Sequence, residues 1–269
     1  MCFEKLKNRE YEFYTCDVFT NERFCGNQLA VLPCAEGLNG KTMQKIAREF
    51  NYSETTFVTK SEKPDCDFKV RIFTPAEELP FAGHPTLGTA FILANNMMIK
   101  SESKTCEITF EMGIGPVKVQ VNYENKKPVF MRFSLNNFAI SEKTLLTNGE
   151  IASAINLQKN NIDALDLVPV KIDFGAVMLM VPLKSIAALE RARINHQKWD
   201  SVISSQNIKV LYLFNQNNKG KRGEYSSRMF APELGVYEDP ATGAQRQLWL
   251  WFSRIMMPQY ASKQMVILS

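Results

Sequence analysis

The sequence predicts an α+β fold made of two similar halves, and three observations lead to this prediction. Short apolar stretches typical of strands far outnumber those typical of helices, and the two do not alternate regularly as they do around a parallel sheet. A set of residues from the first half recurs in the second half, which indicates an internal duplication. Of the 269 residues, 45% are hydrophobic and 11% are aromatic, enough for the core of one large domain or two small ones.

The elements of the first half follow from composition and periodicity. Residues 41–50 are expected to form a short amphipathic helix, because Met43, Ile46 and Phe50 recur on one face. Residues 85–94 are expected to form a second helix, entered through a proline that fits the first turn. Runs rich in aromatic and β-branched residues predict strands. These strands cover residues 11–19, 27–32, 55–59, 68–73, 108–111 and 116–121.

The second half shows the same mixture of elements. One short helix is expected at residues 147–155. Strands are expected at residues 129–135, 168–172, 177–181 and 209–214. We place the first half at residues 1–125 and the second at residues 126–269.

The internal duplication is carried by one motif. Both copies read R-Φ-F-x-P, then E-L, then an ionisable residue, then P-x-x-G. Chance recurrence is the alternative, but seven matched positions in one order favour duplication. Each copy predicts a strand, a turn and a helix that begins at the second proline, so the two halves should face each other across a cleft. The matched pairs are Arg71 and Arg228, Phe73 and Phe230, Pro75 and Pro232, Glu78 and Glu233, Leu79 and Leu234, Pro85 and Pro240, and Gly88 and Gly243.

Each copy places an ionisable side chain, His84 or Asp239, directly before the start of a predicted helix. Backbone N–H groups in the first turn of a helix lack intrahelical partners and favour an anion. Two such helix ends at one cleft would suit a small substrate that carries a carboxylate. The alternatives are a structural histidine and an aspartate that caps the following helix.

Glu54 is the candidate acid/base group. It lies where a predicted helix gives way to a strand, close to Phe57 and Val58. Apolar surroundings raise the pKa of a carboxyl group toward the range that is useful for proton transfer. A surface or capping carboxylate is the alternative, and spacing alone does not decide between them.

Charge and cysteine patterns argue against several classes of protein. The 32 basic and 28 acidic residues are interspersed, with a net charge of +4, so nucleic acid is not an expected partner. Six cysteines without a C-x-x-C pair and only two histidines give little material for a metal site. No glycine-rich phosphate loop is present.

The apolar stretches are too short to span a membrane. Free thiols and the lack of a targeting segment indicate a cytoplasmic protein.

Several segments together resemble the PhzF family of phenazine-biosynthesis-type proteins. They occur in the family's order from about residue 11 to residue 243. The stretch ELPFAGHPTLGTA at residues 78–90 is the most specific of them. The other segments are DVFT at 17–20, FCGN at 24–27, SETTFV at 53–58, IFTP at 72–75 and EDPATG at 238–243.

The resemblance implies a diaminopimelate-epimerase-like fold. In that fold, two similar domains each wrap strands around a central helix, and the active site lies in the cleft between them. It also implies an isomerase that needs no cofactor and no metal, and that moves a proton between carbons of a dihydro-hydroxyanthranilate. Family members of this kind are typically homodimers.

The resemblance further implies roles for individual residues. Glu54 corresponds to the family's acid/base glutamate, and His84 and Asp239 would orient the substrate or share charge with Glu54. The backbone N–H groups of glycines in the two loops would contact the substrate. The implied substrate-binding residues are Gly83, Gly243, Asn27 and Ala244.

The sequence departs from the family pattern at two places. Ala244 stands where the family usually has a serine, and the chain ends at Ser269 where relatives generally continue with further strands. We therefore expect a second half that is shortened at its C-terminus and an activity that is affected by it. Related epimerases use two opposed cysteines, which the corresponding loops lack. The alternatives are a catalytically degenerate, ligand-binding family member and an epimerase whose second base is not a cysteine.

Overall fold

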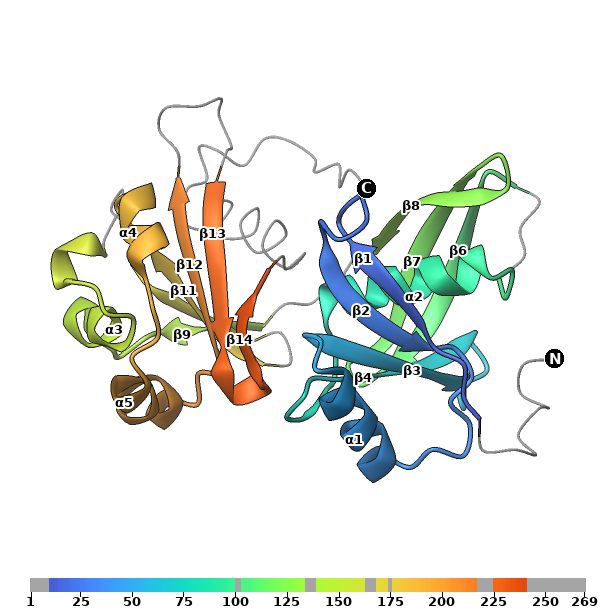
Figure 1. The fold of residues 1–269 in the computed structure, drawn as a ribbon, viewed down its shortest axis with the longest axis horizontal. Helices are drawn as coiled ribbons and strands as arrows, with labels where there is room; N and C mark the ends of the chain where they lie inside the picture. Colours follow the sequence, from blue (N-terminus) through green and yellow to red (C-terminus); the bar gives the residue numbers. More distant parts are fainter. Residues whose placement is uncertain are drawn as a thin grey trace. The chain divides into compact units, whose positions relative to one another are not determined.

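The computed structural model describes residues 10–99, 103–133, 139–162, 168–173, 176–216 and 225–240. These residues belong to two compact units. The first unit comprises the described residues up to 133, and the second comprises those from 139 to 240 (Figure 1). Each unit combines a mixed sheet with a few helices, which confirms the predicted α+β class.

The sheet of the first unit has eight strands within the described residues. Their order is β1-β2-β3-β4-β6-β7-β8, and β5 pairs with β4. The pairs β2–β3 and β4–β6 are parallel, and the other neighbours are antiparallel. The strands are β1 (Tyr14–Val18), β2 (Asn27–Leu32), β3 (Glu54–Lys60), β4 (Phe68–Phe73), β5 (Glu78–Leu79), β6 (Thr105–Met112), β7 (Gly115–Glu124) and β8 (Lys127–Phe133).

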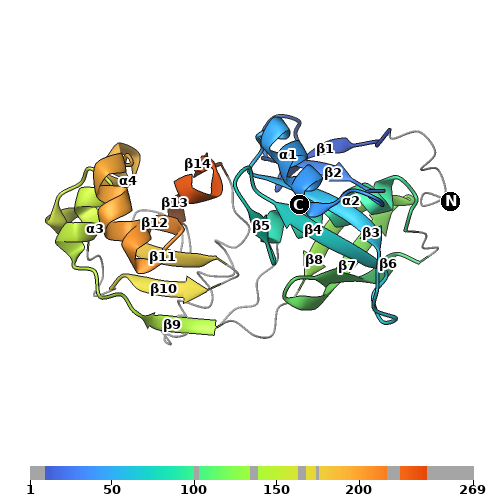
Figure 2. The same cartoon turned by 90° about the horizontal axis from the view of Figure 1, so that it is seen from below.

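Helix α2 (Gly83–Asn95) is the central helix of the first unit, and the strands curl around it (Figures 1 and 2). It contacts β1, β2, β3, β7 and β8. Gly88 allows this close approach, because a Cβ atom there would lie 2.5 Å from Leu29 Cδ2 and 2.8 Å from Val18 Cγ2. The buried hydroxyls of Thr89 and Thr56 are 2.8 Å apart and bond helix to strand. The predicted helix is therefore confirmed, and it begins two residues earlier than expected.

Helix α1 (Gly40–Phe50) packs outside this sheet against β3 and β4. Asn39 caps it by accepting a hydrogen bond of 2.9 Å from the backbone N–H of Thr42. Its predicted apolar face is observed, since Met43 is buried in a cluster against which Ile46 and Phe50 pack.

A hairpin of β7 and β8 ends the first sheet. Asn125 and Lys126 connect the two strands with φ angles of 50° and 64°, as a two-residue turn of type I′ requires. The predicted division between residues 125 and 126 falls inside this turn, and the limits of the two halves stay a prediction.

The sheet of the second unit has six strands within the described residues, in the order β14-β13-β12-β11-β10-β9. Only the pair β11–β12 is parallel among them. Helices pack on this sheet, because Ile151 and Leu189 share one core with Leu179, Leu211 and Phe230. The strands are β9 (Ala139–Lys143), β10 (Val170–Asp173), β11 (Val177–Pro182), β12 (Val210–Gln216), β13 (Tyr225–Ala231) and β14 (Val236–Asp239).

The helices of the second unit are short. Helix α3 (Asn148–Ala154) confirms the helix predicted at 147–155, and Thr147 and Glu150 form a capping box at its start. Helices α4 (Ile186–Arg191) and α5 (His196–Lys198) were not predicted, because segments of this length show no readable period. The second central helix, predicted to begin at Pro240, lies outside the described residues. Single helical turns occur at Lys159–Asn161, Trp199–Ile203, Ser204–Gln206 and Pro232–Leu234.

The first copy of the repeated motif forms a compact contact on β4 and β5. Arg71 donates two hydrogen bonds to the Glu78 carboxylate, of 2.7 Å from Nε and 2.6 Å from Nη2. The guanidinium carbon lies 5.1 Å from the centre of the Phe73 ring. Residues of the repeated motif thus form both the ion pair and the cation–π contact.

The second copy forms the same contact with a different glutamate. Arg228 lies 4.8 Å from the centre of the Phe230 ring and donates to Glu238, not to Glu233. Glu233 lies in the helical turn before β14 and accepts a hydrogen bond from Ser204. The matched residues Glu78 and Glu233 therefore have different partners, because an ion pair is selected by distance and not by order along the chain.

Candidate functional site

Three predicted site residues meet in the first unit. Asn27 is the first residue of β2, Glu54 is the first residue of β3, and His84 follows the first residue of α2. Parallel pairing places Glu54 opposite Leu29, two residues from Asn27. β2 and β3 are parallel, so they start at the same end of the sheet, and α2 starts beside them. All three side chains therefore lie at that end of the sheet.

The contacts among these side chains are short. His84 Nε2 lies 3.3 Å from Glu54 Oε2, and the Asn27 Nδ2 amide lies 3.3 Å from His84 Nδ1. One ring nitrogen of His84 thus lies within hydrogen-bond distance of the Asn27 amide, and the other ring nitrogen faces Glu54. All three residues are buried, with Asn27 at 0%, His84 at 2% and Glu54 at 8% exposure.

His84 is neutral in this environment. Burial lowers its pKa from 6.5 to about 3, and a hydrogen bond with the backbone of Gln28 opposes this only in part. The contact with Glu54 is therefore not an ion pair at neutral pH. Glu54 therefore faces a neutral imidazole ring.

The start of helix α2 adds backbone donors to this group. Gly83 is the first residue of the helix, and Ala82 before it has no side chain that could cap the helix. The N-cap residue of this thirteen-residue helix therefore supplies no side-chain acceptor to its first N–H groups. Such a helix start favours a carboxylate, as the sequence predicted for Gly83 and His84.

Asp239 lies in the second unit, as the last residue of β14. It pairs with Met229 on β13 and is 4% exposed. The side chain is buried. Its role as a helix cap or as a partner of Glu54 stays a prediction. Gly243 and Ala244 lie outside the described residues.

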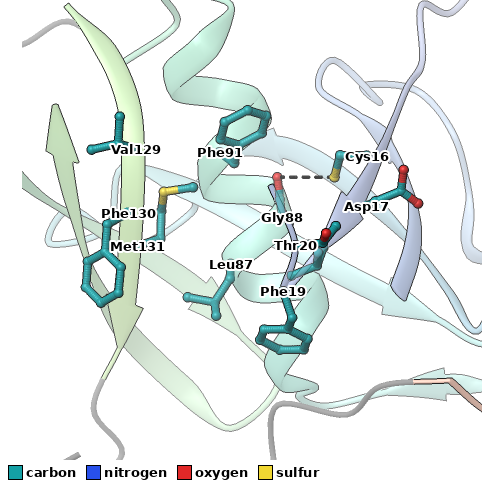
Figure 3. Close-up of a pocket in the computed structure, with 11 residues that line it drawn as sticks. Cys16, Asp17, Phe19, Thr20, Leu87, Gly88, Phe91, Val129, Phe130 and Met131 are labelled. Atoms are coloured by element: carbon teal, nitrogen blue, oxygen red, sulfur yellow. Dashed lines mark hydrogen bonds between the residues drawn. The ribbon is translucent and has the colours of Figure 1, made fainter. Parts of the chain in front are cut away.

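A pocket of about 130 Å³ lies beside this group, at the seam where the edge strands β1 and β8 approach each other across α2 (Figure 3). Phe19 connects the pocket to the site, since its ring centre lies 6.5 Å from that of His84. The sequence did not indicate this pocket, because its two walls come from distant parts of the chain. The lining residues are Cys16, Asp17, Val18, Phe19, Thr20, Leu87, Gly88, Phe91, Val129, Phe130 and Met131.

The Cys16 thiol in this pocket is not a nucleophile at neutral pH. Burial, with a smaller contribution from the Asp17 charge, raises its pKa to about 12. Cys16, Cys25, Cys66 and Cys106 are free thiols. Cys34 is disulfide-bonded, which departs from the expectation of free thiols throughout.

Within the described ranges, no group of three or more histidine, cysteine, aspartate or glutamate side chains could hold a metal ion. None of the helices in that part of the chain is long and apolar enough to cross a membrane.

Fold and site together define a class of protein: two units of the diaminopimelate-epimerase-like type, with a buried glutamate and histidine at the start of a central helix. The model of the PhzC-PhzF family, described as phenazine biosynthesis-like protein, matches residues 16–264. The chain belongs to this family, which confirms the resemblance seen in its sequence.

Two named relatives are similar over most of their length. An uncharacterised isomerase of Mesorhizobium japonicum is 33% identical over 242 residues, which cover 89% of this chain and 78% of the relative. The trans-2,3-dihydro-3-hydroxyanthranilate isomerase of Pseudomonas aeruginosa is 31% identical over 240 residues, which cover 87% and 76%.

Solved structures agree on the fold. A phenazine biosynthesis protein of the PhzF family from Bacillus anthracis has a TM-score of 0.73 at 26% identity, covering 90% of this chain and 80% of that one. A hydroxyproline epimerase from Agrobacterium vitis has a TM-score of 0.64 at 9% identity, covering 93% and 78%. The second likeness concerns the fold alone.

Proposed function

We propose that this protein is a cofactor-independent isomerase that moves a proton between two carbons of a small, ring-shaped substrate carrying a carboxylate. Glu54 is the acid/base group. The observation that carries the proposal is the buried contact of 3.3 Å between Glu54 Oε2 and His84 Nε2, at the start of a helix that has no side-chain cap.

The neutral state of His84 supports a single carboxyl group as proton carrier. A protonated histidine would hold Glu54 as a carboxylate and oppose its protonation, whereas a neutral imidazole does not. Asn27 supports the same arrangement, because its amide lies against His84 Nδ1. His84 and Asn27 thus orient Glu54 in this proposal.

Substrate binding is assigned to backbone donors. The first-turn N–H groups at Gly83 bind the substrate carboxylate in this proposal, and Asp239, Gly243 and Ala244 are its other assigned substrate-binding residues. The relatives named trans-2,3-dihydro-3-hydroxyanthranilate isomerase support a cyclic amino acid of that kind. The homodimer and the cytoplasmic location stay predictions.

Solvent deuterium exchange tests the role of Glu54. Wild-type protein, incubated with trans-2,3-dihydro-3-hydroxyanthranilate in D₂O, should introduce deuterium at the carbon that receives the proton. Glu54→Gln should lower the rate by a factor of about 100 or more, the contribution that a positioned acid/base group makes.

Glu111 offers a matched control for this experiment. It is 8% exposed, like Glu54, and lies in the same sheet, but its carboxylate accepts hydrogen bonds from Ser61 and Glu62. Glu111→Gln should therefore keep the exchange rate. Equal rates in wild type and Glu54→Gln would refute the role of Glu54, and substrate binding without any exchange would favour the ligand-binding alternative.

A further inference from the structure

Asp239 is held by a weak part of the second sheet. Its strand, β14, has a neighbour on one side only within the described sheet. The register also shifts by one residue between the pairs Met229↔Asp239 and Ala231↔Val236, so a bulge directly precedes Asp239. Bulges loosen the hydrogen bonds of the sheet and redirect the side chains that follow them. The position of β14 at Asp239 therefore depends on contacts besides the strand pairing.

Arg228 supplies this support through the neighbour of Asp239. Its Nε and Nη2 atoms donate hydrogen bonds of 2.7 Å and 2.8 Å to the two carboxylate oxygens of Glu238. Two parallel bonds fix both the distance and the orientation of a carboxylate. The hydrogen bonds from Arg228, together with its charge, also hold the pKa of Glu238 below its usual value, so Glu238 stays ionised at neutral pH.

The same guanidinium is anchored to the end of helix α4. Its Nη1 atom donates hydrogen bonds of 2.8 Å to the carbonyl oxygens of both Leu189 and Ala192. Carbonyl groups at the end of a helix lack intrahelical partners and are good acceptors. Stacked on Phe230 as well, Arg228 connects β13, the bulged β14 and α4 through one rigid side chain.

We propose that Arg228 is a positioning residue for Asp239. By holding Glu238 and the end of α4 in one arrangement, it sets the direction in which β14 presents the Asp239 carboxylate. Arg228 itself does not touch the substrate. That this direction matters for the reaction rests on the proposed function.

The first unit contains a matched control. Arg71 makes the same two-bond pair with Glu78 and the same stacking on Phe73. However, β4 and β5 pair without a register shift, and the segment 80–82 separates Glu78 and Leu79 from the site residues Gly83 and His84. The loss of this ion pair should therefore not redirect His84.

The experiment compares Arg228→Lys with Arg71→Lys in the full chain. Each change keeps one positive charge and removes the two-bond geometry. The first measurement is the side-chain carboxyl ¹³C resonance of Asp239, assigned by its loss in Asp239→Asn. It should shift or broaden in Arg228→Lys and stay unchanged in Arg71→Lys.

The second measurement is turnover of trans-2,3-dihydro-3-hydroxyanthranilate. For Arg228→Lys we expect kcat to fall between about tenfold and a hundredfold, the effect of displacing a group by about 1 Å, with a smaller change in KM. Arg71→Lys should keep both constants. Glu238→Gln, which retains size and one acceptor oxygen, should act in the same direction if Arg228→Lys folds poorly.

The outcomes separate the two proposals. An Asp239 resonance that is the same in wild type, Arg228→Lys and Glu238→Gln would overturn the positioning role, and so would an equal disturbance by Arg71→Lys. If wild type shows no turnover while the resonance responds only to Arg228 and Glu238, the proposed function fails and the positioning role stands.

Discussion

The two units stabilise their helices in different ways. In the first unit, strands curl around α2, which has no side-chain cap and is buried along most of its length. In the second unit, α3 and α4 pack on the sheet and begin with side-chain caps from Thr147 and Ser185. A helix enclosed by strands gains most of its stability from packing. A helix on the outside depends more on its cap.

The largest expected effect concerns the burial of His84 at the start of α2. Its pKa is about 3 in the folded state against 6.5 ordinarily. As the pH falls below 6.5, His84 becomes protonated in the unfolded chain but stays neutral in the folded protein. The free energy of unfolding should therefore decrease from pH 6.5 toward pH 3, by up to about 1.4 kcal/mol for each pH unit.

Urea unfolding of wild type and His84→Gln at about pH 7 and about pH 5 measures this contribution. The variant should lose less stability between the two pH values than wild type does. His196→Gln, which replaces an exposed histidine of the second unit, controls for the change of residue type. If wild type and His84→Gln lose the same stability between the two pH values, His84 is not buried in its neutral form.

The next largest effect should come from the glycines of α2 and α3. Gly88→Ala would place its Cβ 2.5 Å from Leu29 Cδ2 in a packed core, and we expect a loss of about 1–3 kcal/mol from overpacking. Gly149→Ala in α3 meets only Thr147 Oγ1, at 3.9 Å, and should stabilise by about 0.4–1 kcal/mol.

Amide hydrogen exchange, followed on peptides from each unit, resolves the two effects. Exchange should become faster in α2 and its surrounding strands for Gly88→Ala, and slower in α3 for Gly149→Ala. If Gly88→Ala has the same stability as wild type, α2 is packed less tightly against its strands than we infer.

Substitutions of the helix caps should have a smaller effect than Gly88→Ala. Thr147→Ala removes the acceptor for the Glu150 backbone N–H at the start of α3 and should cost about 1 kcal/mol. Asn39→Ala at α1 should cost a similar amount, because that helix also lies outside its sheet. Thermal unfolding of both variants checks this. No loss of stability in either would contradict the dependence of the outer helices on caps.

Much of the first unit could be predicted from the sequence, because its signals are local. The apolar face of α1 and the alternation of strands such as β4 need only neighbouring residues to be recognised. Glu54, His84 and Asn27 could be named because each lies in a short motif of the family. Their mutual distances could not, since they depend on the parallel pairing of β2 with β3 and on the course of α2 through the sheet.

Other features had no local signal. The pocket beside Phe19 combines β1 and β8, which are brought together only when the sheet curls around α2. Glu238 could not be told from Glu233 as the partner of Arg228, because both follow the same strand. A bulge in β14 and the end of α4 decided between them.

The sequence by itself determined the α+β class, the family and the chemical groups at the site, because these follow from periodicity and from residues that are adjacent in the chain. The tertiary structure decided the environment of those groups. It buried His84 so that it is neutral, brought it to 3.3 Å from Glu54, and selected Glu238 for Arg228. Burial and distance arise only when segments far apart in the chain pack together, and they control both the pKa of a side chain and its choice of partner.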